Sequence, residues 1–331
     1  MKALPRIHLM IGPGTLPSRG KDRMDFTNYR RSGHPRMTGE ELLEALPEIA
    51  GFAQVSVDRG NPWEVATVND MHKLAQAMND LARLSEVDGI VFVQGTNVLE
   101  ETAYFLHLTV HTEKPIVVTG AQRPFTALSS DAPLNLLNAC RAAAEPSSRG
   151  KGVIVVANGE INSAREVTKT NTYHVQTFRS RDLGVIGYAD ADRILYYRSP
   201  TRRHTSESEF SLDGLGRLPI VEILYVYAGT QRGMAQAACN LGAKGLVLAG
   251  IGAGAAGHLN DECAEIAGSG RAVVVRSARV GEGRVVRDSG YHEPGFVAAD
   301  NLSPQKAALL LSLALTRTTN PDEIQRMFDQ Y

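Results

Sequence analysis

The chain has few cysteines and no long hydrophobic run. Its 331 residues include three cysteines, Cys140, Cys239 and Cys263, an odd and widely spaced set that argues against a disulfide framework or a zinc site. No apolar run approaches the roughly 20 residues that span a bilayer, and the first residues lead into a strand pattern without a signal-peptide apolar stretch. We therefore expect a cytoplasmic protein without a membrane segment, whose cysteines are buried as small hydrophobic residues.

The chain also lacks an excess of charge of either sign. Lys and Arg number 35 against 36 Asp and Glu, which gives a formal net charge of −1. This balance offers no electrostatic footprint for a polyanion, so a nucleic-acid partner is not expected. The rest is an ordinary globular composition, 43% hydrophobic and 21% charged, and the length favours two domains that each bury a core.

Short β-branched runs alternate with helical patterns in the first half of the chain. The predicted strands are 7–11, 90–93, 115–118 and 153–156, and the predicted helices are 70–84, 99–110 and 135–144. This alternation predicts βαβ units on a parallel sheet, in which strands covered on both faces are almost continuously apolar. In such a sheet the ligand crevice opens at the carboxyl ends of the strands.

A polar stretch from about position 199 to 217 separates this pattern from a smaller one of the same kind. The predicted elements of the second half are strands at 220–227, 246–249 and 272–275 and helices at 307–314 and 322–328. We therefore predict an α/β protein with a larger, parallel-sheet N-terminal domain over 1–198. A linker over 199–218 and a smaller α/β C-terminal domain over 219–331 complete the expected organisation.

Two threonine-bearing turns carry most of the chemical information. The turns 12–15 and 94–97 each directly follow an apolar run and contain Thr15 and Thr96 beside glycines. Because side chains just past strand ends line the crevice of an α/β sheet, both threonines are expected to converge on one small substrate. A Thr hydroxyl can attack an amide carbonyl when a base takes its proton, and glycines let backbone N–H groups approach the oxyanion. The turns therefore favour acyl chemistry.

Several of these positions also have purely structural interpretations. Asn97 and Glu100 fit a helix capping box, in which Asn97 accepts the N3 amide and Glu100 reaches back. Lys169 stands in the polar run 166–172, which is typical of a surface lysine. The basic segment 17–38 lacks periodicity; we interpret it as a mobile lid that closes over the substrate, with a solvated loop as the alternative.

Two further patterns suggest other chemistry. The glycine-rich segment 252–257 follows an apolar run, and with Arg276 after the next strand it mimics an NADP-type dinucleotide fingerprint. A tight strand-to-helix turn explains the glycines equally well, and we favour it. His107 and His111 lie four apart on a predicted helix and could form a metal pair. With no matching third ligand nearby, an exposed helix face is favoured instead.

Several motifs together resemble the bacterial L-asparaginase family, over a stretch from about Ile7 to the C-terminus. They are Thr96 with 100–106, then 119–124, 167–172, 203–205, 252–254, 275–280 and 303–307. The resemblance implies an amidohydrolase that converts a side-chain amide to a carboxylate plus ammonia. It also implies a homotetramer assembled from intimate dimers, with a small-molecule amide as its partner and no cofactor or metal.

The resemblance further implies a role for individual residues. Thr15 is the expected nucleophile and Tyr29, on the lid, assists it. Thr96 and Lys169 form a second catalytic cluster, which supplies a titratable amine. The residues expected to shape the oxyanion region are Gly14 and Ala121.

Both turns depart from the family pattern. The first reads Gly-Pro-Gly-Thr where the family usually has Thr-Gly-Gly-Thr, so Pro13 removes an N–H and fixes φ. In the second, Asn97 replaces an Asp. A carboxylate near Lys169 would hold its ammonium form, so the amide should lower the pKa of Lys169 relative to the family pattern.

The substrate-recognition positions differ as well. The family's Ser and following polar residue, which bind the substrate's α-carboxylate and α-amine, align with Trp63 and Glu64, and the neighbouring subunit's acidic residue aligns with Asp288. Among Asn97, Glu64 and Asp288, the two acidic residues keep the negative charge that binding of a substrate ammonium group needs. The Ser that binds the substrate's α-carboxylate in the family is absent here, and the Trp63 N–H or a lid arginine could substitute for it. We therefore predict a small amide substrate other than L-asparagine. The alternatives are an ordinary asparaginase or glutaminase and a catalytically silent small-molecule sensor.

Overall fold

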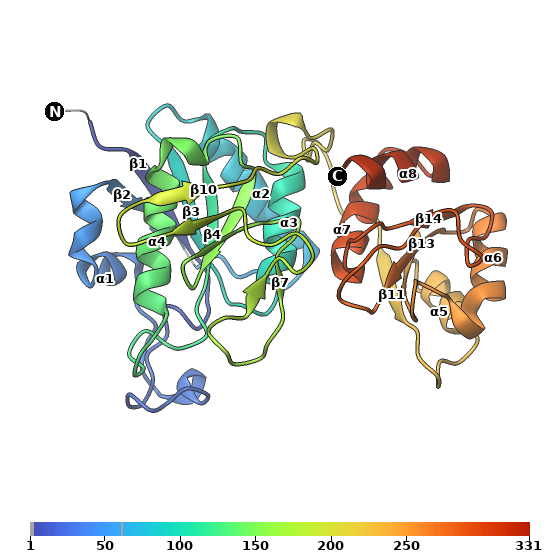
Figure 1. The fold of residues 1–331 in the computed structure, drawn as a ribbon, viewed down its shortest axis with the longest axis horizontal. Helices are drawn as coiled ribbons and strands as arrows, with labels where there is room; N and C mark the ends of the chain where they lie inside the picture. Colours follow the sequence, from blue (N-terminus) through green and yellow to red (C-terminus); the bar gives the residue numbers. More distant parts are fainter. Residues whose placement is uncertain (1–2, 61) are drawn as a thin grey trace. The chain divides into compact units, whose positions relative to one another are not determined.

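The computed structural model describes residues 3–60 and 62–331. The chain forms two compact units, the first ending at Ser208 and the second spanning Glu209–Tyr331. Each unit has a parallel-dominated sheet of its own, and the first sheet is the larger (Figure 1). The predicted α/β class, with a larger first and a smaller second domain, is confirmed.

The first sheet has the strand order β10-β9-β6-β5-β4-β3-β1-β2. Its strands are β1 (Arg6–Ile11), β2 (Gln54–Val57), β3 (Gly89–Val93), β4 (Ile116–Thr119), β5 (Val153–Ala157), β6 (Glu160–Ser163), β9 (Gly187–Ala189) and β10 (Ile194–Tyr196). Strands β2, β1, β3, β4 and β5 pair in parallel, whereas β6, β9 and β10 extend the sheet in antiparallel fashion. Every residue of β3, β4 and β5 is buried, which accounts for their unbroken apolar sequence.

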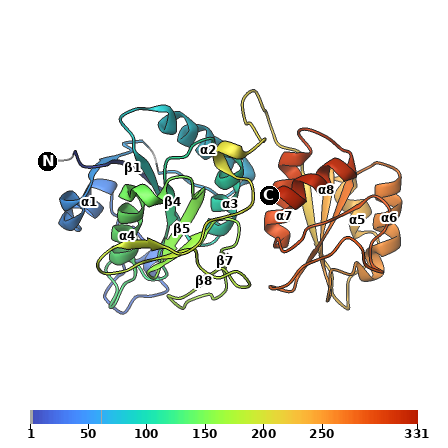
Figure 2. The same ribbon diagram turned by 45° about the horizontal axis from the view of Figure 1, so that its top comes forward.

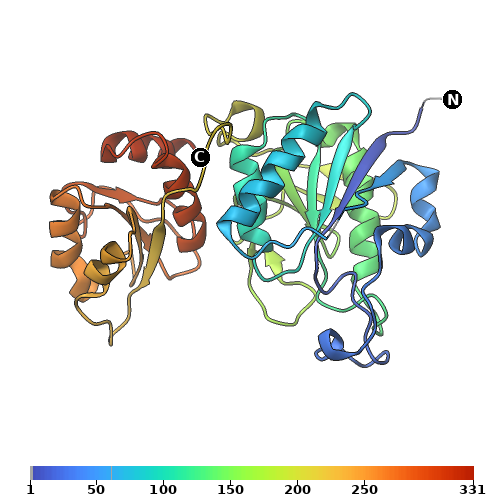
Figure 3. The ribbon, with the colours of Figure 1, turned by 180° about the vertical axis from the view of Figure 1, so that it is seen from behind.

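Helices cover both faces of this sheet. Helices α2 (Val68–Arg83) and α3 (Leu99–Thr109) pack together on one face, and α1 (Gly39–Glu44) and α4 (Ala132–Ala144) lie on the other (Figures 1 and 3). Capping boxes at Thr38 and Thr67 start α1 and α2, because each threonine accepts the N3 amide while the N3 carboxylate returns to the cap. The two helical layers leave the carboxyl ends of β1, β3 and β4 to be covered by loops.

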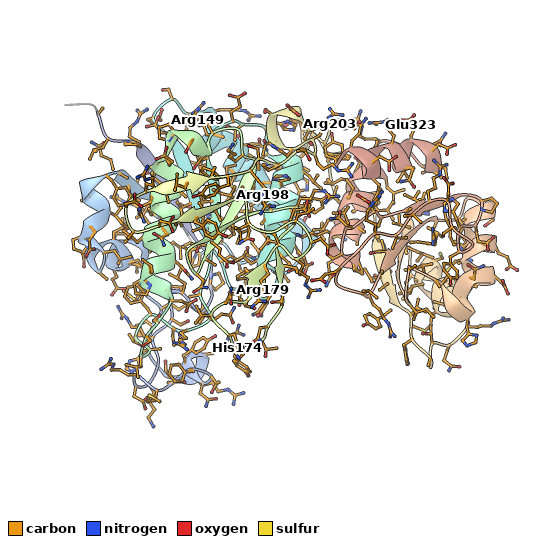
Figure 4. All side chains as sticks on the ribbon, viewed as in Figure 1. Arg149, His174, Arg179, Arg198, Arg203 and Glu323 are labelled. Atoms are coloured by element: carbon orange, nitrogen blue, oxygen red, sulfur yellow. The ribbon has the colours of Figure 1, made fainter. Side chains whose placement is uncertain are left out.

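Two small elements supply these loops. The one-turn helix η1 (Tyr29–Arg31) stands in the loop after β1, and a separate two-stranded sheet joins β7 (Thr168–Lys169) to β8 (Phe178–Arg179). Figure 2 labels this second element, and Figure 4 marks Arg179 on β8 and His174 in the turn before it. The remaining 3-10 segments of the unit are η2 (Pro47–Gly51), η3 (Pro146–Ser148) and η4 (Thr205–Glu207).

The second unit is a four-stranded parallel sheet between two helical layers. Its strands, in spatial order, are β11 (Val221–Tyr225), β12 (Gly245–Gly250), β13 (Val273–Ala278) and β14 (Phe296–Ala298). Its helices are α5 (Met234–Asn240), α6 (Asn260–Gly268), α7 (Pro304–Ala314) and α8 (Pro321–Gln330), with η5 (Gly257–Leu259) before α6. Figure 1 shows α7 and α8 on one face of this sheet and α5 and α6 on the other.

The glycine-rich segment after β12 forms a tight turn. Gly252 and Gly254 adopt positive φ angles of 51° and 88°, and a Cβ on Gly250 would lie 2.6 Å from the carbonyl carbon of Gly254. Arg276 is 0% exposed within β13 and donates to the Val286 carbonyl at 2.7 Å. A buried guanidinium cannot present itself to a cofactor phosphate, so the structure supports the turn rather than the dinucleotide interpretation.

The prediction that His107 lies on an exposed face of its helix, α3, was wrong. This residue is 1% exposed, its Nδ1 accepts the Val153 N–H at 3.1 Å, and its ring lies 4.8 Å from that of His204. The segment η4 packs against α3 and covers the face that the sequence pattern left open. His111 lies beyond the end of α3 and is exposed.

The cysteines are free thiols, with Cys140 and Cys263 buried and Cys239 partly buried. Burial raises the pKa of both Cys140 and Cys263 to about 12, which keeps these two thiols protonated. None of the helices within 3–60 and 62–331 combines the length and apolar character needed to cross a membrane.

Candidate active site

The two threonine-bearing turns lie against each other. The Gly95 N–H donates to the Pro13 carbonyl at 3.0 Å, and the Gly12 N–H donates to the Val93 carbonyl at 2.7 Å. A Cβ on Gly14 would stand 2.6 Å from both the N and the Cα of Gly95, so the contact requires glycine. Pairing of β1 with β3 thus brings distant segments of the sequence to one point at the carboxyl edge of the sheet.

Thr15 faces Tyr29. Its Oγ1 lies 2.7 Å from the Tyr29 hydroxyl, and Thr15 itself is only 6% exposed. The loop that carries Tyr29 is tied down at two points, because Ser18 and Arg23 accept backbone hydrogen bonds from Phe125 and Leu128. Segment 17–38 therefore brings Tyr29 to Thr15, and its motion as a lid stays a prediction.

Thr96 and Lys169 form a second contact. The Lys169 Nζ donates to Thr96 Oγ1 at 2.8 Å, and Glu100 Oε2 accepts the backbone N–H of Lys169. Burial lowers the pKa of Lys169 below its ordinary value of 10.5, while the charge of Glu100 acts in the opposite direction. Lys169 is thus a half-buried amine in contact with a hydroxyl, in contrast to its interpretation as a surface residue.

The capping box predicted at the start of α3 does not form. The N-cap is Val98, which has no side-chain cap, and Asn97 is exposed. The Glu100 carboxylate is committed to Lys169 instead of returning to the helix end. A tertiary hydrogen bond has replaced the local one that the sequence pattern indicated.

Trp63 lies beside the first turn. Its N–H donates to the Ile11 carbonyl at 2.9 Å, and its own carbonyl stands 2.5 Å from where a Cβ on Gly12 would be. The indole Nε1–H donates to Asp58 Oδ2 at 2.5 Å. The indole N–H therefore already has an acceptor in Asp58. It does not replace the family's Ser as a donor to the substrate carboxylate, which the sequence had suggested. The neighbouring Glu64 is exposed.

Ala121 belongs to a third turn, after β4. A Cβ on Gly120 would lie 2.6 Å from the Gln94 carbonyl oxygen and 3.1 Å from Thr96 Cγ2, so this turn packs on the second one. The Asp131 carboxylate accepts the backbone N–H groups of Gln122 and Arg123, each at 2.9 Å. Burial raises the pKa of Asp131, whereas these hydrogen bonds oppose the shift.

Sequence reasoning missed two carboxylates at this edge, Asp58 and Asp131. For Asp131 a signal existed, since an Asp followed by Ala-Pro is a helix start. For Asp58 nothing in the local sequence indicates an indole partner five residues on. Asp288 is exposed in the second unit, between β13 and β14, and its predicted contribution to a neighbouring subunit stays a prediction.

The fold and this edge define an α/β protein with hydroxyl groups, a half-buried lysine and glycine turns gathered at the carboxyl ends of its strands. Comparison with known proteins agrees over almost the whole chain. Residues 6–202 match the family model "Asparaginase, N-terminal", and residues 220–328 match "Glutaminase/Asparaginase C-terminal domain".

Individual relatives cover the chain equally well. "L-asparaginase 2" of Bacillus subtilis is 41% identical over 100% of this chain and 88% of its own length. "Probable L-asparaginase periplasmic" of Haemophilus influenzae is 40% identical over 99% and 93%, and "Glutaminase-asparaginase" of Acinetobacter glutaminasificans is 36% identical over 96% and 97%. The chain belongs to the asparaginase family. It is therefore an amidohydrolase of the class that acts on C–N bonds of linear amides.

Proposed function

We propose that this chain hydrolyses a small amide to a carboxylate plus ammonia, with Thr15 as the nucleophile. The observation that supports this most is the pair of contacts at the touching turns. Thr15 Oγ1 lies 2.7 Å from the Tyr29 hydroxyl, and Lys169 Nζ lies 2.8 Å from Thr96 Oγ1. Each of the two threonine hydroxyls therefore lies within hydrogen-bond distance of a group that can accept or donate a proton.

In the proposed first step, Thr15 Oγ1 bonds to the amide carbon while its proton passes through the Tyr29 hydroxyl. Gly14 and Ala121 leave room for backbone donors at the developing oxyanion. Collapse of the tetrahedral intermediate breaks the C–N bond, and the proton taken from Thr15 passes from the Tyr29 hydroxyl to the nitrogen, which leaves as ammonia. A Thr15 ester remains.

In the second step, water attacks this ester and gives up a proton, the bond between the acyl carbon and Thr15 Oγ1 breaks, and that proton is returned to Thr15 to restore its hydroxyl. The contact of Lys169 with Thr96 suggests how the water loses its proton, because the lowered pKa of Lys169 makes its neutral form more accessible. The balance is amide plus water giving carboxylic acid plus ammonia. Neutral Lys169 is the base, so the rate should rise with pH through its pKa.

We further propose that recognition is altered away from L-asparagine. Trp63 and Asn97 replace the Ser and Asp of the family pattern, and the Trp63 indole is held in place by Asp58. Glu64 and Asn97 are exposed, so a polar end of the substrate can still meet them, and Asp288 is proposed to come from the neighbouring subunit. The relatives include both asparaginases and glutaminase-asparaginases by name, and an ordinary specificity of that kind is the alternative.

The test is ammonia release from L-Asn, L-Gln, their D-forms and N-substituted and cyclic amides. Thr15→Val should lose at least about 10³-fold in kcat, whereas Thr201→Val, at an exposed threonine of the same unit, should keep the wild-type rate. A wild-type protein that releases ammonia from none of these amides would refute the hydrolase assignment. Saturable binding without turnover would instead indicate a catalytically silent sensor.

Assembly and location complete the proposal. We propose a homotetramer of intimate dimers, in which Asp288 is supplied to a neighbouring subunit, and a cytoplasmic location. Light scattering on the purified protein tests the first, and fractionation of the producing cells tests the second. One relative is named periplasmic, so recovery from the periplasm is the outcome that would overturn the location.

A further inference from the structure

Lys169 needs a counter-charge that the second turn does not supply. Asn97 carries no charge, and its side chain is exposed. An ammonium held in a half-buried position without a carboxylate would be strongly disfavoured. A different group must therefore set the charge state and the position of this amine.

Glu100 is placed to do so. It lies in the first turn of α3, three residues after Asn97, and is only 7% exposed. Its carboxylate accepts a hydrogen bond from the backbone N–H of Lys169. The same lysine reaches Thr96 with its Nζ at 2.8 Å. A single strand residue is thus held at its backbone by a buried carboxylate and at its side chain by the threonine hydroxyl.

Three other charged residues close to β7 have partners of their own. Arg165 and Glu166, just before the strand, are paired with each other at 2.8 Å. Arg179, opposite Thr168 on β8, donates to the Gln176 side chain at 3.1 Å. Glu100 is the group whose field raises the pKa of Lys169 against the effect of burial.

We propose that Glu100 is a positioning residue for the Lys169–Thr96 pair and the source of the buried negative charge that acts on this amine, where Asn97 supplies none. Glu100 touches no reacting atom in this scheme. It fixes the strand that carries Lys169 and sets how readily the amine is deprotonated. The catalytic consequence rests on the proposed function, but the electrostatic link between the two side chains does not.

Competitive labelling of lysines with acetic anhydride, read by mass spectrometry over a pH series, gives the pKa of Lys169 without any substrate. Glu100→Gln keeps an acceptor for the Lys169 N–H but removes the charge, so this pKa should fall measurably below that of wild type. Glu113→Gln, at an exposed site in the same unit, is the matched control and should leave it unchanged. Adding Asn97→Asp to Glu100→Gln should raise it again.

The acid limb of the pH profile for ammonia release should shift by the same amount in Glu100→Gln. An unchanged Lys169 pKa in that variant would overturn the proposal, even if the enzyme is active. Glu100→Asp keeps the negative charge but moves it farther from Lys169, so the Lys169 pKa should fall less than in Glu100→Gln. This variant provides the test if Glu100→Gln does not fold. If the labelling shift appears and no amide is hydrolysed, the positioning role stands and the proposed function fails.

Discussion

The indole N–H of Trp63 donates to the carboxylate of Asp58 at 2.5 Å, across a loop that also ties Asp58 Oδ1 to the Gly60 N–H at 3.1 Å. Both carboxylate oxygens are thus occupied, and the indole has a fixed partner beside the Thr15 turn. In the proposed recognition role, an aromatic side chain fixed in this way would restrict what can enter. Because the N–H is engaged, the proposed selection by Trp63 would rest on shape and on its aromatic surface rather than on a hydrogen bond to substrate.

Asp58→Asn should loosen this indole. The Asn amide offers one acceptor oxygen in place of two, so it cannot accept from both the Trp63 indole N–H and the Gly60 N–H in the present geometry. A hydrogen bond to a charged acceptor contributes about 1.5–3 kcal/mol. We expect KM for the best amide to rise about 10-fold with a smaller change in kcat. The control is Asp80→Asn, at an exposed pair with Arg83, which should change neither constant.

Restoring the family's recognition residues should increase turnover of L-asparagine. Trp63→Ser returns a small hydroxyl, and Asn97→Asp returns a carboxylate near the second turn. The double variant should raise kcat/KM for L-asparagine by about 10-fold or more, relative to wild type measured in parallel. An unchanged or lower value would show that these two positions do not recognise the substrate.

Tyr29→Phe removes the hydroxyl that lies 2.7 Å from Thr15 Oγ1. Since proton transfer by a positioned group contributes about 10²–10⁴-fold, kcat should fall by at least about 10²-fold with KM little changed. Tyr173→Phe, at a tyrosine that is 67% exposed, is the control. Equal losses in both variants would argue against a proton-relay role for Tyr29.

The central strands and both threonine turns could be predicted because their signals are local. Short runs rich in apolar, β-branched residues, with a glycine one or two positions after each, are typical of strands in a covered parallel sheet, and they located β1, β3, β4 and β5. The short antiparallel strands β6, β9 and β10 were not predicted, because segments of three or four residues carry too little periodicity.

The orientation of side chains could not be predicted where tertiary contacts replace local ones. Glu100 fits a capping box by spacing, but its carboxylate binds Lys169 across the fold. His107 has the spacing of an exposed face, but η4 covers it. In both cases the competing partner lies far along the chain, so no window of sequence around the residue contains the information.

The buried His204, whose ring lies 4.8 Å from that of His107, should make the first unit sensitive to acid. Burial lowers the pKa of His204 from 6.5, with Glu207 opposing. Below about pH 6.5 the unfolded chain therefore binds a proton that the folded one resists, and stability falls as pH drops towards the folded-state pKa. The melting temperature of His204→Gln should depend less on pH between about 5 and 7 than that of wild type. His34→Gln, at an exposed histidine, should keep the wild-type dependence.

Contact between the two threonine turns should be essential for both stability and activity. In Gly14→Ala the new Cβ would meet backbone atoms of Gly95 at 2.6 Å, and neither turn can yield without separating Thr15 from Thr96. We expect a loss of about 1–3 kcal/mol in the free energy of unfolding, with ammonia release reduced well beyond the unfolded fraction. Gly51→Ala, where a Cβ meets nothing within 4 Å, should change stability by no more than about 0.5 kcal/mol. Wild-type behaviour of Gly14→Ala in both denaturant unfolding and ammonia release would mean that the two turns can separate without consequence, and that the site does not depend on their contact.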